Sequence, residues 1–464
     1  MSARGWIGAL VLSTALGACA PGMDAQRLSS STAPLTPLAV YDPGPPRPIP
    51  PMRANAEMVN DLLELGFYME SGREIPQFSR FEGPVQVVVR NSPHALAEAD
   101  LDRLLARLRN EAGIRITRAP GNAARDGENL ITVEYVQRRT MRAVVPGAAC
   151  FVVPNVASWD EFAANRRSPT IDWTRVSLRT RAAVFVPFDT TPQEIRDCLH
   201  EEIAQALGPL NDLFRLTDSV FNDDNFQTTL TGFDMLVLRV WNAPDLQPGM
   251  TRDQVAARLP TVFNRLNPAG RRSPGPIPER SPRAWVLAVE QALSGENTAG
   301  QRRESAMRAL SLARAQGWAD ARMALSLMII ARLAPRDQGE AALMALLTAA
   351  EIYRQLPGGE VHAAHLDMNL AVQALASGQF DLVLELTARA RPMAQRTENA
   401  ALLASLGFLR AEALAQLGRN DEAERIRLDS MPAARYGFGS ETAARARMDE
   451  IARLTGAALR MAQR

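Results

Sequence analysis

The sequence predicts an α+β domain with a mixed sheet in residues 55–265 and an all-α domain of helical repeats in residues 283–464. Three observations predict this division. Strand patterns alternate with helical patterns only in the first part, and helical periodicity alone continues in the second. A proline-rich segment, residues 266–282, separates the two and indicates a hinge.

Apolar runs rich in β-branched residues predict the strands of the first part. They cover Val85–Arg90, Asn129–Val136 and Arg181–Pro187, and residues 150–153 are a further candidate. Because proline cannot donate a ladder hydrogen bond, Pro187 predicts either an edge strand or the end of a strand.

Helical spacing of apolar residues predicts helices between and after these strands. Residues 98–109 carry leucines on a single stripe. Thr191, followed by a proline, is typical of an N-cap and predicts a long helix to about Leu207. Thr231 and Asp234 have the spacing of a capping box and predict the start of another helix.

Three similar turns divide the second part. They contain Asp337, Asp381 and Asp421, which lie 44 and 40 residues apart, and each turn joins two helical stretches. Small residues in these stretches allow helix pairs to stack on one another. The pattern resembles tetratricopeptide-type (TPR-like) repeats in a divergent form, and an irregular helical bundle is the alternative.

The composition is that of a globular protein without a charged field. Hydrophobic residues make up 46% and charged residues 22% of the chain, and the formal net charge is +1. No nucleic-acid partner is expected. All 52 basic residues are arginine, and the lack of lysine excludes a P-loop lysine, a Schiff-base lysine and a Ser-Lys dyad.

Residues 1–18 have the pattern of a signal peptide. Arg4 gives the positive start, and residues 6–16 form an apolar stretch shorter than the about 20 residues that span a bilayer. Export from the cytoplasm is therefore expected.

The end of this leader, Leu16-Gly17-Ala18-Cys19, resembles the lipobox of bacterial lipoproteins. The resemblance implies that Cys19 becomes the acylated N-terminus. Ala20, in place of an aspartate, implies sorting to the periplasmic face of the outer membrane, where several acyl chains would anchor the protein stably. An ordinary secretory signal is the alternative.

Residues 19–54 lack periodicity and are rich in serine, threonine and proline. Such a composition favours extended polyproline geometry over a packed element. The segment is predicted to be a semi-rigid tether between the lipid and the folded part.

Cys150 and Cys198 remain once Cys19 is assigned to lipid. In an oxidising compartment they are expected to form a disulfide. Two separate buried thiols are the alternative.

The one stretch that indicates chemistry is residues 198–212, Cys-Leu-His-Glu-Glu-Ile-Ala-Gln-Ala-Leu-Gly-Pro-Leu-Asn-Asp. It resembles a degraded form of the metzincin zinc helix, His-Glu-x-x-His-x-x-Gly-x-x-His/Asp, in which the glutamate is the general base. The resemblance places Glu201, Gln205 and Asn211 at the ligand positions, Glu202 at the position of the base and Gly208 at the bend, where a left-handed conformation is expected.

The residues after this stretch have the same order as in metzincins. Ser219-Val220-Phe221 stands where a Ser-x-Met turn would be, and residues 230–241 resemble the closing helix of matrixin-like enzymes. The resemblance covers about residues 80–245 and implies a metzincin-like zinc-peptidase fold with a long helix at the site.

Residues 56–260 as a whole resemble a family of bacterial lipoproteins that carries a domain of unknown function. Its pattern, Glu-Glu-x-x-Gln-x-Leu-Gly-x-x-Asn-Asp, is matched here from Glu201 to Asp212. This resemblance implies the fold and no activity.

The side chains at the ligand positions argue against zinc. Gln205 and Asn211 offer neutral amide oxygens, which suit hard cations weakly and zinc poorly. No cofactor is expected. Zinc is a less favoured alternative, and so is calcium at Asp218 with residues 222–225.

The chain has four histidines, and none fits a zinc site. His200 is expected to be a neighbour of the site or a surface residue, and His362 and His365 are expected on a solvated helix face.

The favoured interpretation is therefore a pseudoenzyme, a periplasmic, non-catalytic module that binds a protein or peptide, for instance by pairing a strand along the edge of its sheet. The alternative is an envelope hydrolase of the peptidase type. It would use Glu202 as general base, with non-histidine metal ligands or with no metal.

Overall fold

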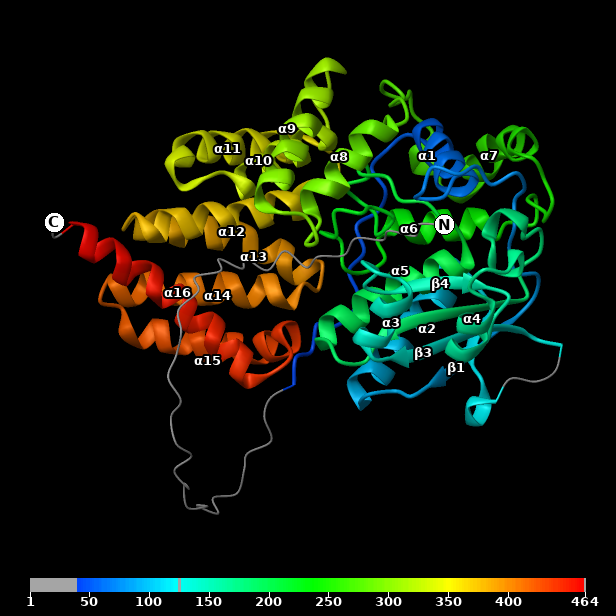
Figure 1. The fold of residues 1–464 in the computed structure, drawn as a ribbon, viewed down its shortest axis with the longest axis horizontal. Coiled ribbons are helices and arrows are strands. Elements are labelled where there is room, and N and C mark those ends of the chain that lie inside the picture. Colours follow the sequence, from blue (N-terminus) through cyan, green and yellow to red (C-terminus); the bar gives the residue numbers. More distant parts are fainter. Residues whose placement is uncertain (1–39, 124–126, 463–464) are drawn as a thin grey trace, which may run out of the picture.

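The computed structural model describes residues 40–123 and 127–462 of the chain. A mixed α/β domain is followed by a region of helices only, as the sequence predicts, and the two lie side by side (Figure 1). Cys19 and the predicted signal peptide lie outside the described residues.

The α/β domain is built on one five-stranded sheet with the order β2-β1-β3-β5-β4, in which only β4 is antiparallel. The strands are β1 (Val85–Arg90), β2 (Ile116–Arg118), β3 (Asn129–Val136), β4 (Phe151–Pro154) and β5 (Arg181–Pro187). All the predicted strands are confirmed, and Pro187 ends a strand that lies inside the sheet. The helices of this domain are α1 (Asn55–Phe67), α2 (Ala95–Ala112), α3 (Arg138–Val144), α4 (Trp159–Asn165), α5 (Pro192–Leu207), α6 (Gly232–Trp241) and α7 (Arg252–Leu266).

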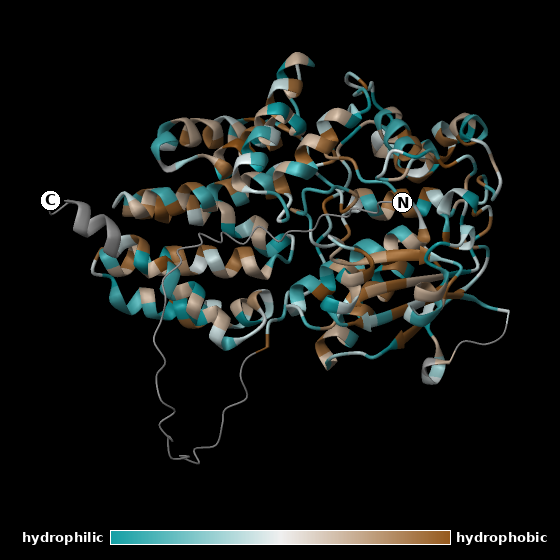
Figure 2. Ribbon diagram, in the orientation of Figure 1, coloured by the Kyte–Doolittle hydropathy of each residue, from teal (hydrophilic) through white to brown (hydrophobic). Residues whose placement is uncertain are grey.

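Both faces of the sheet are covered, and hydrophobic residues concentrate in its strands (Figure 2). Because side chains alternate along a strand, Val184 and Val186 of β5 face the core formed with α2 and α5. Phe185 faces the other way, into a smaller aromatic core with Phe151 and Phe162. The sheet therefore packs against one side of α5 and positions the C-terminal end of this helix.

The C-terminal region is a series of packed helix pairs, which confirms helical repeats in the coarse sense. The helices are α8 (Arg283–Leu293), α9 (Ala299–Ala315), α10 (Ala321–Leu333), α11 (Gly339–Gln355), α12 (Glu360–Ala376), α13 (Phe380–Arg396), α14 (Ala400–Gln416), α15 (Asn420–Phe438) and α16 (Glu441–Ala462). The three predicted turns separate α10 from α11, α12 from α13 and α14 from α15. Gly378 and Gly418 take positive φ at the last two, where a Cβ would be strained.

The two parts share an interface in which side chains from both are buried. Gln193 of α5 donates to Asn399 Oδ1 at 3.1 Å and accepts from the amide of Ala401 at 2.8 Å. Phe214 of the first domain packs edge-on to Trp285 of α8, with ring centroids 5.5 Å apart. The α/β domain and the helices therefore form one packed body.

Part of the expected tether, residues 40–54, lies against both parts. Tyr41 packs on Tyr436 of α15 with ring centroids 5.1 Å apart, and Arg103 of α2 donates to the carbonyl of Gly44 at 3.1 Å. Gly232 leaves room for this segment, since a Cβ there would lie 2.2 Å from the carbonyl oxygen of Ile49.

Candidate functional site: an acid cluster at the end of α5

Helix α5 presents the polar residues that the sequence singles out. Thr191 caps its start by accepting from the amide of Glu194, as predicted, and Glu201, Glu202 and Gln205 lie in its last two turns. Glu202 is buried, with 3% of its surface exposed, and Glu201 is half-buried.

Gly208 ends the helix, but not in the expected left-handed conformation. Its φ is −149°, so that expectation is wrong. A glycine is nevertheless required by space, because a Cβ would lie 2.8 Å from Cδ2 of Leu238 in the buried helix α6. The close approach of α5 and α6 explains this glycine.

Asp212, and not Asn211, joins Gln205. The Gln205 amide lies 3.4 Å from Glu70 Oε1 and 3.5 Å from Asp212 Oδ2, whereas the Asn211 amide donates to the carbonyl of Glu64 at 3.1 Å. Gln205 therefore belongs to a polar network that is centred on carboxylates.

Five carboxylates meet at this place, and we call them the acid cluster: Glu70, Glu201, Glu202, Asp212 and Asp223. One oxygen from each of Glu70, Asp212 and Asp223 lies within 4.8 Å of the others. Glu201 and Glu202 form an adjoining group of the same spacing with Sγ of Cys150. Glu70 follows α1 and Asp223 lies in the loop before α6, so both lie outside the motif of residues 198–212. The sequence analysis therefore did not predict that they belong to this site.

Burial and mutual repulsion disfavour the charged forms of these groups. Burial raises the pKa of Glu201, Glu202, Asp212 and Asp223 well above their ordinary values, and the neighbouring carboxylates raise them further. Burial also raises the pKa of Glu70, which is hydrogen-bonded to Asp212. Without a cation, each carboxyl group of the cluster is therefore more readily protonated than an exposed one.

Two other buried carboxylates of the chain, Asp61 and Asp367, are neutralised by arginine. Asp61 pairs with Arg53 and with Arg215, the latter at 2.7 Å, and Asp367 pairs with Arg354 at 2.6 Å and with Arg389 at 2.7 Å. Within the described ranges, no member of the acid cluster has an ion-pair partner. This lack of arginine distinguishes the cluster from Asp61 and Asp367.

Two carboxylate oxygens in the cluster are buried without a hydrogen bond. They are Glu202 Oε2 and Asp212 Oδ1, in side chains whose residues are 3% and 8% exposed. Buried polar atoms without a partner are costly and therefore rare.

The predicted disulfide is confirmed. Cys150 and Cys198 are joined with their Cα atoms 5.9 Å apart, which ties the start of β4 to α5. Because Cys150 is oxidised, its sulfur offers no thiolate to the neighbouring glutamates.

His200 is buried beside the cluster and has a structural role. Its Nδ1 accepts from the amide of Leu230 at 3.0 Å, and burial together with Arg107 lowers its pKa well below 6.5. A neutral imidazole that is already bonded in this way orders the chain before α6.

His362 and His365 do not lie on a solvated face, so that prediction is wrong. His362 is fully buried, stacks on Tyr353 and contacts Asp224 Oδ2 at 2.8 Å. His365 packs against Phe226 with ring centroids 4.7 Å apart. The two histidines hold the loop before α6 onto α12.

The loop of residues 222–225 does not form the calcium site considered with Asp218. Asp218 pairs with Arg53 at 2.7 Å, and Asp224 is bonded to Asn222 and His362. Only Asp223 turns to the acid cluster.

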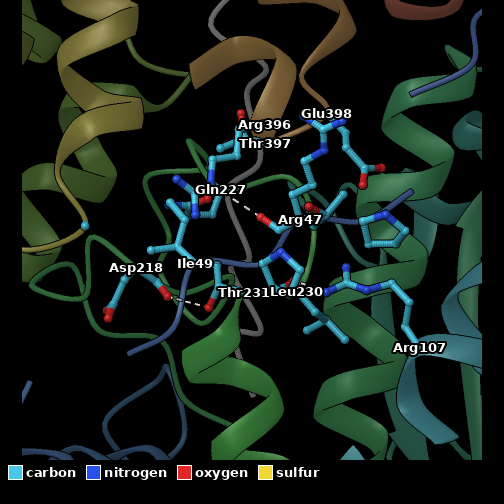
Figure 3. Close-up of a pocket in the computed structure, with 14 residues that line it drawn as sticks. Arg47, Ile49, Arg107, Asp218, Gln227, Leu230, Thr231, Arg396, Thr397 and Glu398 are labelled. Carbon is cyan, nitrogen blue, oxygen red and sulfur yellow. Dashed lines mark hydrogen bonds between the residues drawn. The ribbon is translucent and has the colours of Figure 1, made fainter. Parts of the chain in front are cut away.

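A pocket lies where residues 46–49 cross between the two parts (Figure 3). It has a volume of about 40 Å³ and is bounded by Arg47, Arg107, Thr231 and Glu398, among others. This volume suits a few water molecules and not an organic ligand.

These features define a two-part protein, a mixed α/β domain with an acid cluster and a region of paired helices. Residues 55–261, which span the α/β domain, match the family described as "Protein of unknown function (DUF2927)". No curated protein and no solved structure matches the chain. Among the described residues, no helix is long and apolar enough to cross a membrane.

Proposed function

We propose that this chain is a lipoprotein of the cell envelope, anchored through Cys19, whose α/β domain is a non-catalytic relative of metzincins. With its TPR-like helices it would bind a protein or peptide. The order of β5, α5, the Ser219 turn and α6 supports the metzincin-like interpretation. Ser219 is held at 2.5 Å by Asp234, which forms the predicted capping box of α6.

The non-catalytic interpretation rests on the side chains that occupy the positions of the zinc ligands in metzincins. Among the described residues no imidazole reaches them: His200 is engaged with Leu230, and one carboxylate, Glu201, and two amides, Gln205 and Asn211, stand at the ligand positions. Zinc with such a ligand set would be bound poorly.

The helical region offers a surface for a protein partner. Leu343, Met344 and Leu347 lie close together on α11 and are 39%, 58% and 42% exposed. The edge of β4 is less suitable for strand pairing, because Trp173 donates to the carbonyl of Val152 at 3.4 Å and Pro154 has no amide hydrogen.

The test is crosslinking of the full chain to envelope proteins in intact cells. We expect a partner that is lost in the double variant Met344→Arg/Leu347→Arg and kept in Leu428→Arg. Leu428 is a matched control, since it is 62% exposed on α15. Equal crosslinking in both variants would contradict the proposal that a partner binds at this surface of α11.

A hydrolase is the second candidate, favoured by the buried and unpartnered Oε2 of Glu202. Its raised pKa suits an acid better than a base. Peptide and cell-wall hydrolysis by the purified chain, abolished in Glu202→Gln, would establish this alternative and overturn the non-catalytic proposal.

A further inference from the structure

We propose that the acid cluster is a calcium site in which Glu70, Asp212 and Asp223 supply the ligands. This inference does not depend on the proposed function. It rests on the placement of the three carboxylates and on the two buried oxygens of Asp212 and Glu202 that have no partner.

The spacing of the three carboxylates suits calcium. Calcium binds oxygen at about 2.3–2.6 Å, so ligand oxygens on opposite sides of the ion are separated by up to about 5 Å. The oxygens of Glu70, Asp212 and Asp223 lie within 4.8 Å of one another, inside this limit. Magnesium demands near-ideal octahedral geometry, usually keeps several waters and is bound through only one or two carboxylates, so a set of three carboxylates suits it less well.

Further oxygen atoms that could act as ligands lie near the three carboxylates. Gln205 already faces Glu70 and Asp212, and rotation of its amide would turn Oε1 towards the ion. Glu201 is half-buried and contributes negative charge beside the site. Such an all-oxygen set favours a hard cation over zinc, which prefers nitrogen and sulfur ligands.

The position of the site suggests what calcium would do. Glu70 belongs to the segment after α1, Asp212 follows α5, and Asp223 lies in the loop that His362 holds onto α12. Arg283 of α8 donates to the carbonyl of Glu70 at 3.1 Å. One ion would therefore tie three segments of the α/β domain together where this domain meets the helical region.

The experiment is calcium titration of the full chain purified in detergent, followed by calorimetry and by thermal unfolding with calcium or with a chelator. We expect one calcium ion per chain with a dissociation constant of about 1 mM or lower. Saturating calcium should raise the unfolding temperature by about 5 °C or more. Asp212→Asn and Asp223→Asn should each weaken binding about tenfold or more, by removing a charged ligand.

The same variants distinguish a cation site from a network of protonated acids. In chelator, Asp212→Asn should unfold at a higher temperature than the native chain, because it relieves repulsion, and in calcium it should unfold at a lower one. Glu74→Gln is the control, since Glu74 is exposed in the segment that carries Glu70 and should change neither value. Undetectable binding at 5 mM calcium (about five times the expected dissociation constant), binding unchanged in both asparagine variants, or tighter binding of zinc would each overturn the proposal.

Discussion

Arg179 donates a hydrogen bond of 2.7 Å to the carbonyl oxygen of Gly208, the residue at which helix α5 ends. The same guanidinium donates to the carbonyls of Gln205 and Ala206 at 2.8 and 2.7 Å. It is fully buried and lies 4.9 Å from the ring centre of Trp173. Burial lowers the pKa of Arg179 to about 9, so it stays charged at neutral pH and faces the negative end of the helix dipole. This arginine fixes the end of the helix that carries Glu201, Glu202 and Gln205.

Replacing Arg179 by methionine should therefore destabilise the protein strongly. Three buried carbonyl oxygens would lose their donor, which costs about 3 kcal/mol or more in the free energy of unfolding. Urea unfolding followed by circular dichroism measures this. Arg181→Met is the control. Its side chain is 45% exposed and pairs with Glu161, so a loss below about 1 kcal/mol is expected. Similar losses in both variants would show that Arg179 has no special role.

Gly208→Ala should destabilise the protein because its new Cβ would meet Leu238 at 2.8 Å. Overpacking of this kind costs about 1–3 kcal/mol. Leu238→Ala alone should also be destabilising, because it leaves a cavity. The double variant should lose less than the sum of the two, since the shortened side chain makes room for the new methyl group. Additive losses would rule out this close approach as the reason for the glycine.

The strands and helices of this chain follow from local pattern, which is why their prediction succeeds. Val85–Arg90, Asn129–Val136 and Arg181–Pro187 are strands with the predicted bounds. Thr191 and Thr231 cap α5 and α6 as predicted, because capping depends on residues only three positions apart.

The acid cluster could be predicted only in part. Glu201, Glu202 and Gln205 share one helix, and their proximity follows from its geometry. Glu70 and Asp223 reach them through tertiary folding, for which no sequence period gives an indication. The burial of His362 was missed for the same reason, since the loop of Asp224 that covers it comes from the other domain.

Loss of the disulfide should weaken the protein without removing the site. The bond closes a loop of 48 residues, which is worth about 4 kcal/mol on the entropic account. Cys150→Ala/Cys198→Ala should therefore lower the free energy of unfolding by about that amount. Reductant should lower the stability of the native chain and leave that of the double variant unchanged. If reductant also lowered the stability of the double variant, the loss seen in the native chain could not be attributed to this disulfide.

Cys19→Ser should remove the lipid anchor. Because acylation requires the cysteine thiol, the variant is expected in the soluble periplasmic fraction or attached only through an uncleaved leader. Fractionation and mass spectrometry of the N-terminus distinguish these outcomes. Retention in salt-washed membranes by a variant whose leader has been removed would contradict lipid anchoring.

His365 should make the protein less stable in mild acid. Burial, with a contribution from His362, lowers its pKa to about 3, whereas in the unfolded chain the pKa is about 6.5. Between these values the unfolded chain binds the proton and the folded chain does not, so the free energy of unfolding falls as the pH falls. From pH 7 to pH 5 this single group should cost about 2 kcal/mol.

Urea unfolding of the native chain and of His365→Asn at pH 7 and pH 5 tests this, because contributions from the acid cluster cancel in the comparison. The variant should lose about 2 kcal/mol less stability over this range than the native chain. His94→Asn is the matched control. His94 caps α2 by accepting from the amide of Ala97, a role that asparagine also fills, so this variant should keep most of the native stability at pH 7. If His365→Asn loses as much stability from pH 7 to pH 5 as the native chain, the histidine titrates equally in both states and does not hold the two parts together in its neutral form.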